Sequence, residues 1–398
     1  MLRSFRSLWN TGNGGVLLTI SAGWLVSLGI RIVYPVLLPD IIGEFNIQLT
    51  GAGVLLSALW VAYAVMQFPG GVLADRIGEQ RVILASLITA TSAVVVILVA
   101  PVYWVFGCAT ILLGAGTGLY GPSRVTVLSD VFSQNKNTAV SVSQAAGNVG
   151  NAVLPITAGI ISIWLGWRYG FGFFIPAFVF VSIAVIRYVP ARTSVAPDDA
   201  SLVGYFHDLK NSIDDRAVLY AASTMFCILF YYQGMTGFLP SYLIENKNLQ
   251  QSIVSALYGG FFAAAIGFQF LAGIVADRYG ERRAISLFVV PGVIGAAGLP
   301  FVETNVGVFG MVLLSASILG AIPPANTNIV LQLPKSLQGS GYGLLRSIYI
   351  GLGATAPPLI GYLGDAGMFD TGILLLGVVA SVSIIFCIGL IRSDRTSE

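Results

Sequence analysis

The chain of 398 residues has few charged side chains, because only 10% of its residues are Asp, Glu, Lys or Arg. A water-soluble domain carries about 25%. Hydrophobic residues make up 56% of the sequence, so most of the chain does not face water. The formal net charge of +2 is too small to indicate a nucleic-acid partner. The composition therefore predicts a protein whose partner is the lipid bilayer, with no nucleic acid bound.

Residues that commonly carry catalysis or bind metals are also scarce. His207 is the single histidine, so a histidine-based triad or metal site has little to draw on. The cysteines Cys108, Cys227 and Cys387 lie in apolar stretches without a CxxC pair, as small packing residues do. We therefore expect no enzymatic activity, no cofactor and no metal site.

Long apolar runs recur along the chain, separated by short polar breaks. The first begins near Val16 and is too long for the apolar region of a signal peptide, which spans about 7–15 residues. Crossing a bilayer takes about 20 apolar residues as a helix. The pattern predicts an all-α membrane protein with twelve transmembrane helices, at 15–39, 51–73, 82–100, 103–128, 138–163, 168–188, 218–240, 252–275, 284–302, 306–330, 341–363 and 371–391.

The longest polar stretch divides the chain near its middle. It predicts an N-terminal six-helix bundle at 1–189, a cytoplasmic linker at 190–217 and a C-terminal six-helix bundle at 218–398.

The basic residues predict how the helices are oriented, because cytoplasmic loops are enriched in Lys and Arg. With the N-terminus inside, the outer segments hold only Arg168 and Lys247. We therefore expect a multi-pass protein of the cell membrane with both termini in the cytoplasm. The inner segments would hold Arg3, Arg6, Arg76, Arg81, Lys136, Arg187, Arg192, Lys210, Arg216, Arg278, Arg282, Arg283, Lys335, Arg392 and Arg395.

The two halves contain matching segments at an offset of 202 residues. The sequence GGVLADRIGEQR, from Gly70 to Arg81, matches AGIVADRYGERR, from Ala272 to Arg283. An even number of helices per half leaves the halves parallel in the membrane, so a pseudo-two-fold axis along the membrane normal relates them.

These paired segments resemble the conserved loop of the major facilitator superfamily, G-x-L-A-D-R-x-G-R-K. The resemblance covers essentially the whole chain and implies two pseudo-symmetric six-helix bundles that act as a monomer. It implies alternating access to a central site, with the loop holding the cytoplasmic side closed. The candidate gating residues are Gly71, Asp75, Arg76, Gly78 and Arg81 in the first copy, and Gly273, Asp277, Arg278, Gly280 and Arg283 in the second.

The chemistry of the loop fits a latch that can open. We expect Asp75 to pair with nearby arginines or with the N-terminus of another helix. Gly71 and Gly273 lack side chains and are expected to allow close helix approach. Glu79 and Gln80 depart from the basic pair of the family motif, which is expected to weaken the first latch.

A charge inside a membrane helix is costly and by default indicates a functional site. Arg31 is the clearest case, with apolar sequence on both sides, and Arg124 lies in the fourth helix near Asp130. The resemblance places the first, fourth, seventh and tenth helices around the cavity. The alternative for Arg31 is that it snorkels to the outer surface or is paired internally, and the alternative for the uncharged candidates is that they only tie helices together. The predicted solute-binding residues are Arg31, Tyr34, Arg124, Asn148, Tyr232, Gln233 and Asn326.

No Asp or Glu falls near the middle of a predicted helix, which argues against proton symport through a buried acid. Arginine without a matching carboxylate favours an anionic solute. The leading hypothesis is therefore a secondary active or facilitative carrier of a small organic anion, such as a carboxylate.

Three alternatives remain open. The first is a multidrug or metabolite efflux carrier with aromatic residues such as Tyr63 in its cavity. The second is a nitrate/nitrite-type carrier, because AAGNVGNAVLP at 145–155 resembles part of that group's signature. Those carriers place their anion-binding arginines in the second helix of each half, where this chain has none in mid-membrane. The third is a membrane sensor on a transporter scaffold.

Overall fold

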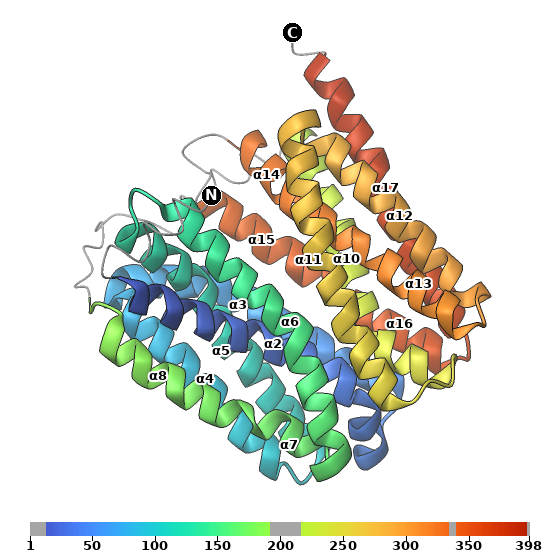
Figure 1. Cartoon of the computed structure of the whole chain (residues 1–398), viewed down its shortest axis with the longest axis horizontal. Coiled ribbons are helices and arrows are strands. Elements are labelled where there is room, and N and C mark those ends of the chain that lie inside the picture. Colours follow the sequence, from blue (N-terminus) through green and yellow to red (C-terminus); the bar gives the residue numbers. More distant parts are fainter. Residues whose placement is uncertain (1–12, 192–215, 334–339, 396–398) are drawn as a thin grey trace. The chain divides into compact units, whose positions relative to one another are not determined.

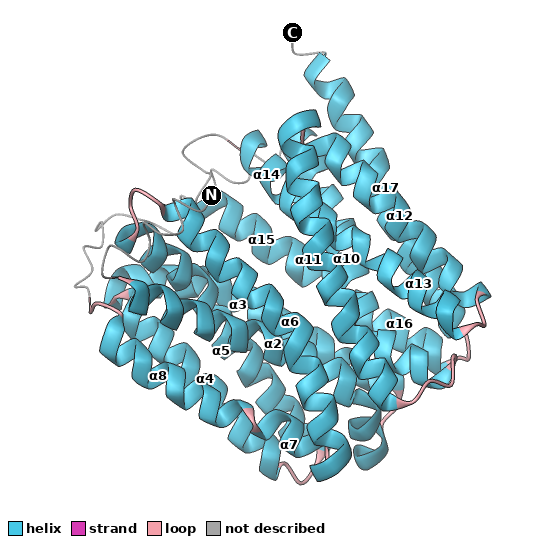
Figure 2. Cartoon of the chain, viewed as in Figure 1, coloured by secondary structure: helices cyan, strands magenta, loops and turns pink. Residues whose placement is uncertain are grey.

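The computed structural model describes residues 13–191, 216–333 and 340–395, and within these ranges it is helical without a strand (Figures 1 and 2). Eleven segments in the described ranges are long and apolar enough to cross a membrane. Most of the predicted linker, including His207, lies outside the described residues.

Contacts between Cα atoms divide the chain into two compact units. Unit 1 holds residues 1–47 and 58–196, and unit 2 holds residues 48–57 and 197–398. Helix α3 (Leu49–Ile77) therefore begins in unit 2 and continues in unit 1. The predicted domain limits at 189/190 and 217/218 stay a prediction.

Unit 1 consists of long helices joined by short turns (Figure 1). The sixth predicted span is one short helix followed by a longer one, which meet at Phe173. The helices are α2 (Gly14–Phe45), α3 (Leu49–Ile77), α4 (Glu79–Val99), α5 (Tyr103–Val131), α6 (Lys136–Leu165), α7 (Trp167–Gly172) and α8 (Phe174–Tyr188).

Helix α2 is longer than the sequence suggested. The predicted end at residue 39 is wrong, because the helix continues through Pro35 and Pro39 to Phe45. Proline is tolerated inside membrane helices where neighbouring helices supply other partners for the freed backbone groups. Arg31 therefore lies fourteen residues from the end of the helix, or about 21 Å along its axis. The predicted end at residue 39 would have placed Arg31 only eight residues from the end of the helix.

Helices α2 and α6 pack closely because glycine stands at their crossing. A Cβ atom added to Gly150 would lie 2.4 Å from the carbonyl oxygen of Leu25, and one added to Gly29 would lie 3.1 Å from that of Gly150. Small residues allow such backbone contact in membrane helices. The glycines of the 145–155 segment therefore have a packing role within unit 1.

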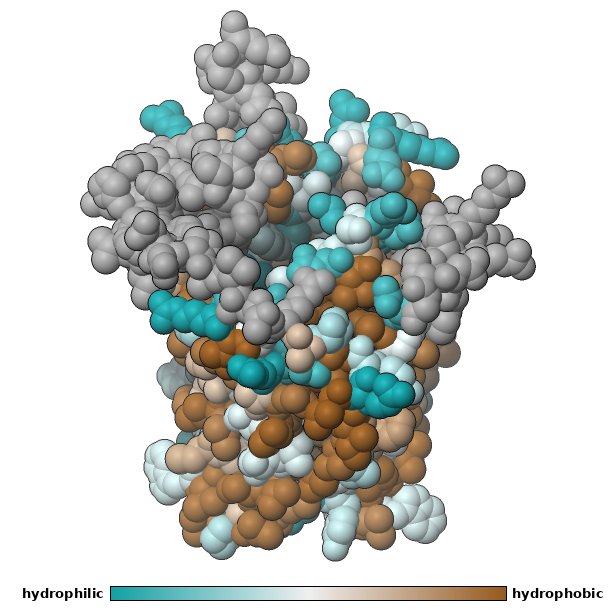
Figure 3. All heavy atoms as spheres, turned by 90° about the vertical axis from the view of Figure 1, so that its left-hand side faces the viewer, coloured by the Kyte–Doolittle hydropathy of each residue, from teal (hydrophilic) through white to brown (hydrophobic). Residues whose placement is uncertain are grey.

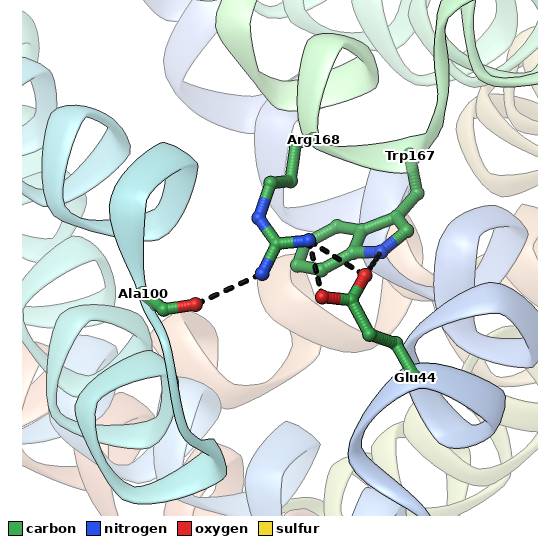
Figure 4. Close-up of polar contacts among 4 residues, drawn as sticks. All are labelled: Glu44, Ala100, Trp167 and Arg168. Atoms are coloured by element: carbon green, nitrogen blue, oxygen red, sulfur yellow. Dashed lines mark hydrogen bonds and ion pairs between the residues drawn. The ribbon is translucent and has the colours of Figure 1, made fainter.

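A cluster at one end of unit 1 fixes the end of α2 against α7 and α4 (Figure 4). Glu44 forms an ion pair with Arg168 and accepts a hydrogen bond of 2.5 Å from the indole nitrogen of Trp167. Arg168 also donates to the carbonyl oxygen of Ala100 at 2.9 Å. Because both charged side chains are partly exposed, the ion pair contributes at most about 1 kcal/mol.

Unit 2 repeats the six spans of unit 1 with more interruptions (Figure 1). Its elements are α10 (Arg216–Glu245), α11 (Gln251–Tyr279), α12 (Glu281–Gly298), η1 (Leu299–Phe301), α13 (Asn305–Ser315), η2 (Ala316–Ala321), α14 (Ile322–Gln332), α15 (Ser340–Gly353), α16 (Ala356–Asp365) and α17 (Phe369–Arg395).

Proline explains where the spans of unit 2 break. The predicted span 341–363 is divided into α15 and α16 at Ala354 and Thr355, just before Pro357 and Pro358. The equivalent helix α6 has Pro155 alone and stays continuous. Two adjacent prolines remove two backbone donors, which ends α15 more effectively than one.

Large apolar side chains are exposed on unit 1, as expected where lipid tails surround a protein. Trp104 is 78% exposed, Trp164 81% and Phe180 73%. Figure 3 shows the face on the left-hand side of Figure 1. Hydrophobic residues cover most of its lower part, and hydrophilic residues gather towards its upper end.

The start of α3 is capped within unit 2 by the last residue of α16. The Asp365 carboxylate accepts hydrogen bonds of 2.8 Å from the backbone nitrogens of Leu49 and Thr50, and one of 2.5 Å from the Thr50 hydroxyl. A carboxylate at a helix N-terminus satisfies free N–H groups and interacts favourably with the helix dipole. Close packing accompanies the cap, because a Cβ on Gly361 would lie 2.3 Å from the Leu49 carbonyl oxygen.

We expect Asp365→Ala to destabilise the purified protein by about 1–2 kcal/mol, because the first turn of α3 loses its acceptor. Thermal unfolding in detergent measures the effect. Glu303→Ala, which removes an exposed carboxylate from the same unit, is the matched control. Equal melting temperatures for the two variants would show that the cap contributes nothing.

Candidate solute-binding site

Arg31 is buried in α2, with only 2% of its surface exposed. Its Nε atom donates a hydrogen bond of 3.2 Å to the carbonyl oxygen of Ser27, one turn earlier in the same helix. Its Nη1 and Nη2 atoms are buried and have no hydrogen-bond partner among the described residues. The charged end of the side chain is therefore removed from water without a carboxylate in its place.

Two aromatic rings of α3 stand beside this guanidinium group. Its Cζ atom lies 3.8 Å from the ring centroid of Tyr63 and 5.1 Å from that of Trp60. The two rings lie 5.8 Å apart at an interplanar angle of 89°. Rings this close attract a cation through their π electrons. They hold Arg31 in place and leave its four terminal N–H groups available to an anion.

Tyr34 is not brought to Arg31, although it is one turn away in α2. Its hydroxyl donates a hydrogen bond of 3.1 Å to Thr110 of α5, and its ring packs edge-on against Phe171 at 4.6 Å. Tyr34 thus joins α2 to α5 and α7, which makes it a packing residue in this structure.

Arg124 of α5 occupies a second polar cluster in unit 1. Its Nη1 donates to the Ser143 hydroxyl at 3.1 Å, and its Nη2 donates to the side-chain oxygen of Gln144 at 3.3 Å. Gln144 in turn donates to Asn148 at 3.4 Å. The Cζ atom of Arg124 lies 4.2 Å from the ring centroid of Trp24. The structure therefore brings the predicted residues Arg124 and Asn148 together through Gln144.

Both arginines lie at helix α2: Arg31 belongs to it, and Arg124 of α5 packs against its Trp24. Trp24, which faces Arg124, and Arg31 are seven residues apart in α2, so they share one face and lie about 10 Å apart along it. Between them, the Ser27 hydroxyl is buried without a partner among the described residues, as is the indole nitrogen of Trp24. Buried polar groups normally have partners. A row of unpartnered donors along one helix face is an arrangement suited to a polar solute.

Two of the predicted residues of unit 2, Gln233 and Asn326, contact α15. Gln233 donates a hydrogen bond of 2.9 Å to the carbonyl oxygen of Ile350, and its own side-chain oxygen is buried without a partner in the described ranges. Asn326 accepts hydrogen bonds from the hydroxyls of Tyr342 at 2.8 Å and Tyr349 at 3.2 Å. Tyr232 is half-buried beside Gln233. None of these residues carries a charge.

The two gating loops have the same backbone geometry. Gly78 has φ 91° and precedes α4, and Gly280 has φ 86° and precedes α12. A side chain is rarely tolerated at such angles, which explains glycine at both positions. Asp75 and Asp277 are exposed, and the described residues provide neither with a hydrogen bond or ion pair. Their pairing therefore stays a prediction. The loop arginines Arg76, Arg81, Arg278 and Arg283 are also exposed.

The expectation that Gly71 and Gly273 allow close helix approach stays a prediction. A Cβ on Gly71 would make only an ordinary contact, 3.8 Å from the side chain of Pro122. One on Gly273 would meet none of the described residues within 4 Å. Within unit 1, the described residues place Gly29 and Gly150 where two backbones cross.

Sequence reasoning did not connect Arg31 with Trp60 and Tyr63. The available signal was the spacing of the two aromatic residues, three apart in one helix and therefore on one face. It also missed Trp24 and Ser143 as partners of Arg124, because these contacts arise only when α2, α5 and α6 pack together.

Comparisons with known proteins agree with this architecture. The cis,cis-muconate transport protein of Acinetobacter baylyi is 23% identical over 356 residues, which cover 85% of each chain. The glycerol-3-phosphate transporter of Bacillus subtilis is 24% identical over 382 residues, covering 86% of this chain and 84% of that protein. At this identity, the solutes in their names do not transfer directly.

A solved structure supports the same fold. The inward-facing, occupied form of a bacterial homologue of the human lysosomal transporter Spinster aligns with a TM-score of 0.80. It has 13% sequence identity, and the match covers 95% of this chain and 96% of that one. The family model of the Major Facilitator Superfamily matches residues 19–355 and 221–398. The relatives named above are transporters of small solutes. The chain belongs to the Major Facilitator Superfamily.

Proposed function

We propose that this protein is a secondary carrier of a small organic anion, which Arg31 binds in alternating access to the two sides of the membrane. The single observation that carries the proposal is the buried guanidinium whose Nη atoms have no partner among the described residues. Both termini then lie in the cytoplasm, as the charge bias predicts, and the carrier acts as a monomer.

The energetics of burial support an anionic solute. A buried polar group without a hydrogen bond costs about 1–3 kcal/mol, and a charged group costs more. The rings of Tyr63 and Trp60 offset only part of this cost, because a cation–π contact contributes about 0.5–2 kcal/mol. A carboxylate would accept two parallel N–H bonds from Arg31 and neutralise its charge.

Arg124 is the proposed second contact for the solute. It lies along the same face of α2, and its side chain is held by Ser143 and Gln144. A solute with two acidic groups, or with one acidic and one polar group, would suit two cations held at α2 positions that lie about 10 Å apart along the helix axis. Asn148 extends the same cluster.

Unit 2 supplies neutral groups at the matching positions. An offset of 202 relates Arg31 to Gln233 and Arg124 to Asn326. An amide can hydrogen-bond a solute without adding charge. We therefore propose that the N-terminal half holds the charge of the solute while the C-terminal half contributes neutral contacts from Tyr232, Gln233 and Asn326.

The proposal predicts the selectivity of the protein in liposomes. Labelled muconate and labelled glycerol 3-phosphate are compared in counterflow with labelled nitrate, a neutral hexose and a lipophilic cation. We expect at least one of the two organic anions to exchange saturably and the other three probes not to exchange. Arg31→Ala should lower kcat/KM by about 30-fold or more, because removing one member of a buried charge pair costs 2 kcal/mol or more.

Arg168→Ala is the matched control, since Arg168 also lies against a tryptophan but is partly exposed at the end of unit 1. Unchanged anion exchange by Arg31→Ala would sink the assigned role. Exchange of the lipophilic cation alone would favour the efflux alternative, exchange of nitrate alone would favour a nitrate-type carrier, and binding without counterflow would favour a sensor.

The aromatic support of Arg31 gives a second prediction. Tyr63→Leu removes the ring nearest the guanidinium, and we expect KM for the transported anion to rise by about 2- to 30-fold, the equivalent of one cation–π contact. Tyr63→Phe keeps the ring and should stay close to wild type. If the two variants raise KM equally, the hydroxyl and not the ring is what matters.

A further inference from the structure

Unit 2 contains a cavity of about 450 Å³ between α12 and α17, which pack against each other (Figure 1). Its size is within the range of sites that bind small ligands. None of its lining residues belongs to the proposed solute site. The lining residues include Arg282, Arg283, Ser286, Leu287, Val290 and Ile388.

The lining is almost wholly apolar, and its two arginines lie at one end. Arg282 and Arg283 lie in the first turn of α12, which begins at Glu281. Leu287 and Val290 follow one and two turns later on the same helix face. Leu287 is 56% exposed, Val290 46% and Ile388 of α17 49%, so the apolar wall is open to the surroundings of the helices. In a membrane-spanning segment those surroundings are lipid tails.

The arginines are not placed to stabilise α12 itself. Positive charge near a helix N-terminus is unfavourable to the helix dipole, which prefers anions there. Arg283 is exposed and has no ion pair within the described ranges. An anion that binds there would interact favourably with both arginine charges and with the helix end.

In unit 1, a side chain bridges α4 and α8, the helices equivalent to α12 and α17. Gln80, at the beginning of α4, donates hydrogen bonds to the carbonyl oxygens of Val185 at 3.3 Å and Val189 at 2.8 Å in and after α8. At an offset of 202, Gln80 corresponds to Arg282. A short amide therefore bridges the helices in unit 1. Unit 2 has a cationic side chain at the matching position, and a cavity lies beside it.

We propose that the crevice between α12 and α17 binds an anionic phospholipid, with its phosphate on Arg282 and Arg283 and an acyl chain along Leu287, Val290 and Ile388. The charge bias assigns this end of the bundle to the cytoplasmic side, where basic pockets between membrane helices bind anionic headgroups. Such a lipid would give Arg283 a partner other than the gate. This proposal does not depend on which solute is transported.

The test measures stabilisation of the full-length protein in micelles that contain phosphatidylcholine. Phosphatidylglycerol is titrated in, and the melting temperature is followed for the wild type, Arg283→Gln, Val290→Trp and Arg187→Gln. The Val290 variant fills the crevice without changing charge. The Arg187 variant removes an exposed arginine from α8 of unit 1 and is the matched control. Native mass spectrometry counts the bound phosphatidylglycerol.

We expect phosphatidylglycerol to raise the melting temperature of the wild type and of Arg187→Gln. Its apparent affinity should fall on the order of tenfold or more in Arg283→Gln, as for a lost hydrogen bond between charged groups. Val290→Trp should also lose the bound lipid. Its melting temperature in phosphatidylcholine alone shows whether it is folded, and if it is not, Arg283→Gln decides the test.

Two results would overturn the proposal. Equal losses for Arg283→Gln and Arg187→Gln would mean that phosphatidylglycerol responds to surface charge and not to the crevice. Equal stabilisation by inorganic phosphate or glycerol 3-phosphate would mean that the arginines bind a soluble anion and that the apolar wall has no part in binding.

Discussion

The guanidinium group of Arg31 is a full positive charge inside a helical unit, with two aromatic rings and one backbone carbonyl as its neighbours. A protein retains such a group against a considerable cost in hydration free energy. Glu44 and Arg168 form an ion pair at the end of unit 1, whereas the Nη atoms of Arg31 have no partner among the described residues. In the proposed function the solute supplies the charge that balances Arg31, which is how a binding site for an anion differs from a structural salt bridge.

The packing of unit 1 fixes the surroundings of Arg31 and Arg124. Gly29 and Gly150 let α2 and α6 approach, and the approach places Gly147 against Trp24, where a Cβ would lie 2.4 Å from the indole. Trp24 then supports Arg124, as Tyr63 supports Arg31. Two cations thus rest on aromatic faces along one side of α2. Rigid aromatic support would lower the entropy lost on binding of the proposed solute.

The sequence predicts the helices well because a bilayer requires long apolar segments, and it predicts the paired loops because only glycine fits the φ angles of Gly78 and Gly280. It fails at Pro39, which does not end α2, and at Pro357 and Pro358, before which the span is broken. Proline thus lies inside a continuous helix in one place and marks a break in another. The outcome depends on whether neighbouring helices supply hydrogen-bond partners for the freed backbone groups, and the local sequence does not encode those partners.

The candidate site was predictable in part for the same reason. Arg31 stands out because charge is rare inside membrane helices, and that signal is local. Its aromatic neighbours on α3 are not local, and neither is the bond that turns Tyr34 towards Thr110. Gly273 matches the family motif, yet none of the described residues lies within 4 Å of the position that a Cβ would take there. A motif indicates which residues recur, whereas the contacts made by each residue depend on how the helices pack.

The most direct test of the central claim compares the wild type with Arg31→Met by thermal unfolding, with and without a saturating concentration of the transported anion. Methionine keeps the length and apolar stem of the side chain and removes its charge. If the charge of Arg31 is balanced only by the solute, Arg31→Met should be at least as stable as the wild type without the anion and should gain nothing from it. A variant that is several kcal/mol less stable than the wild type, yet still stabilised by the anion, would contradict the account.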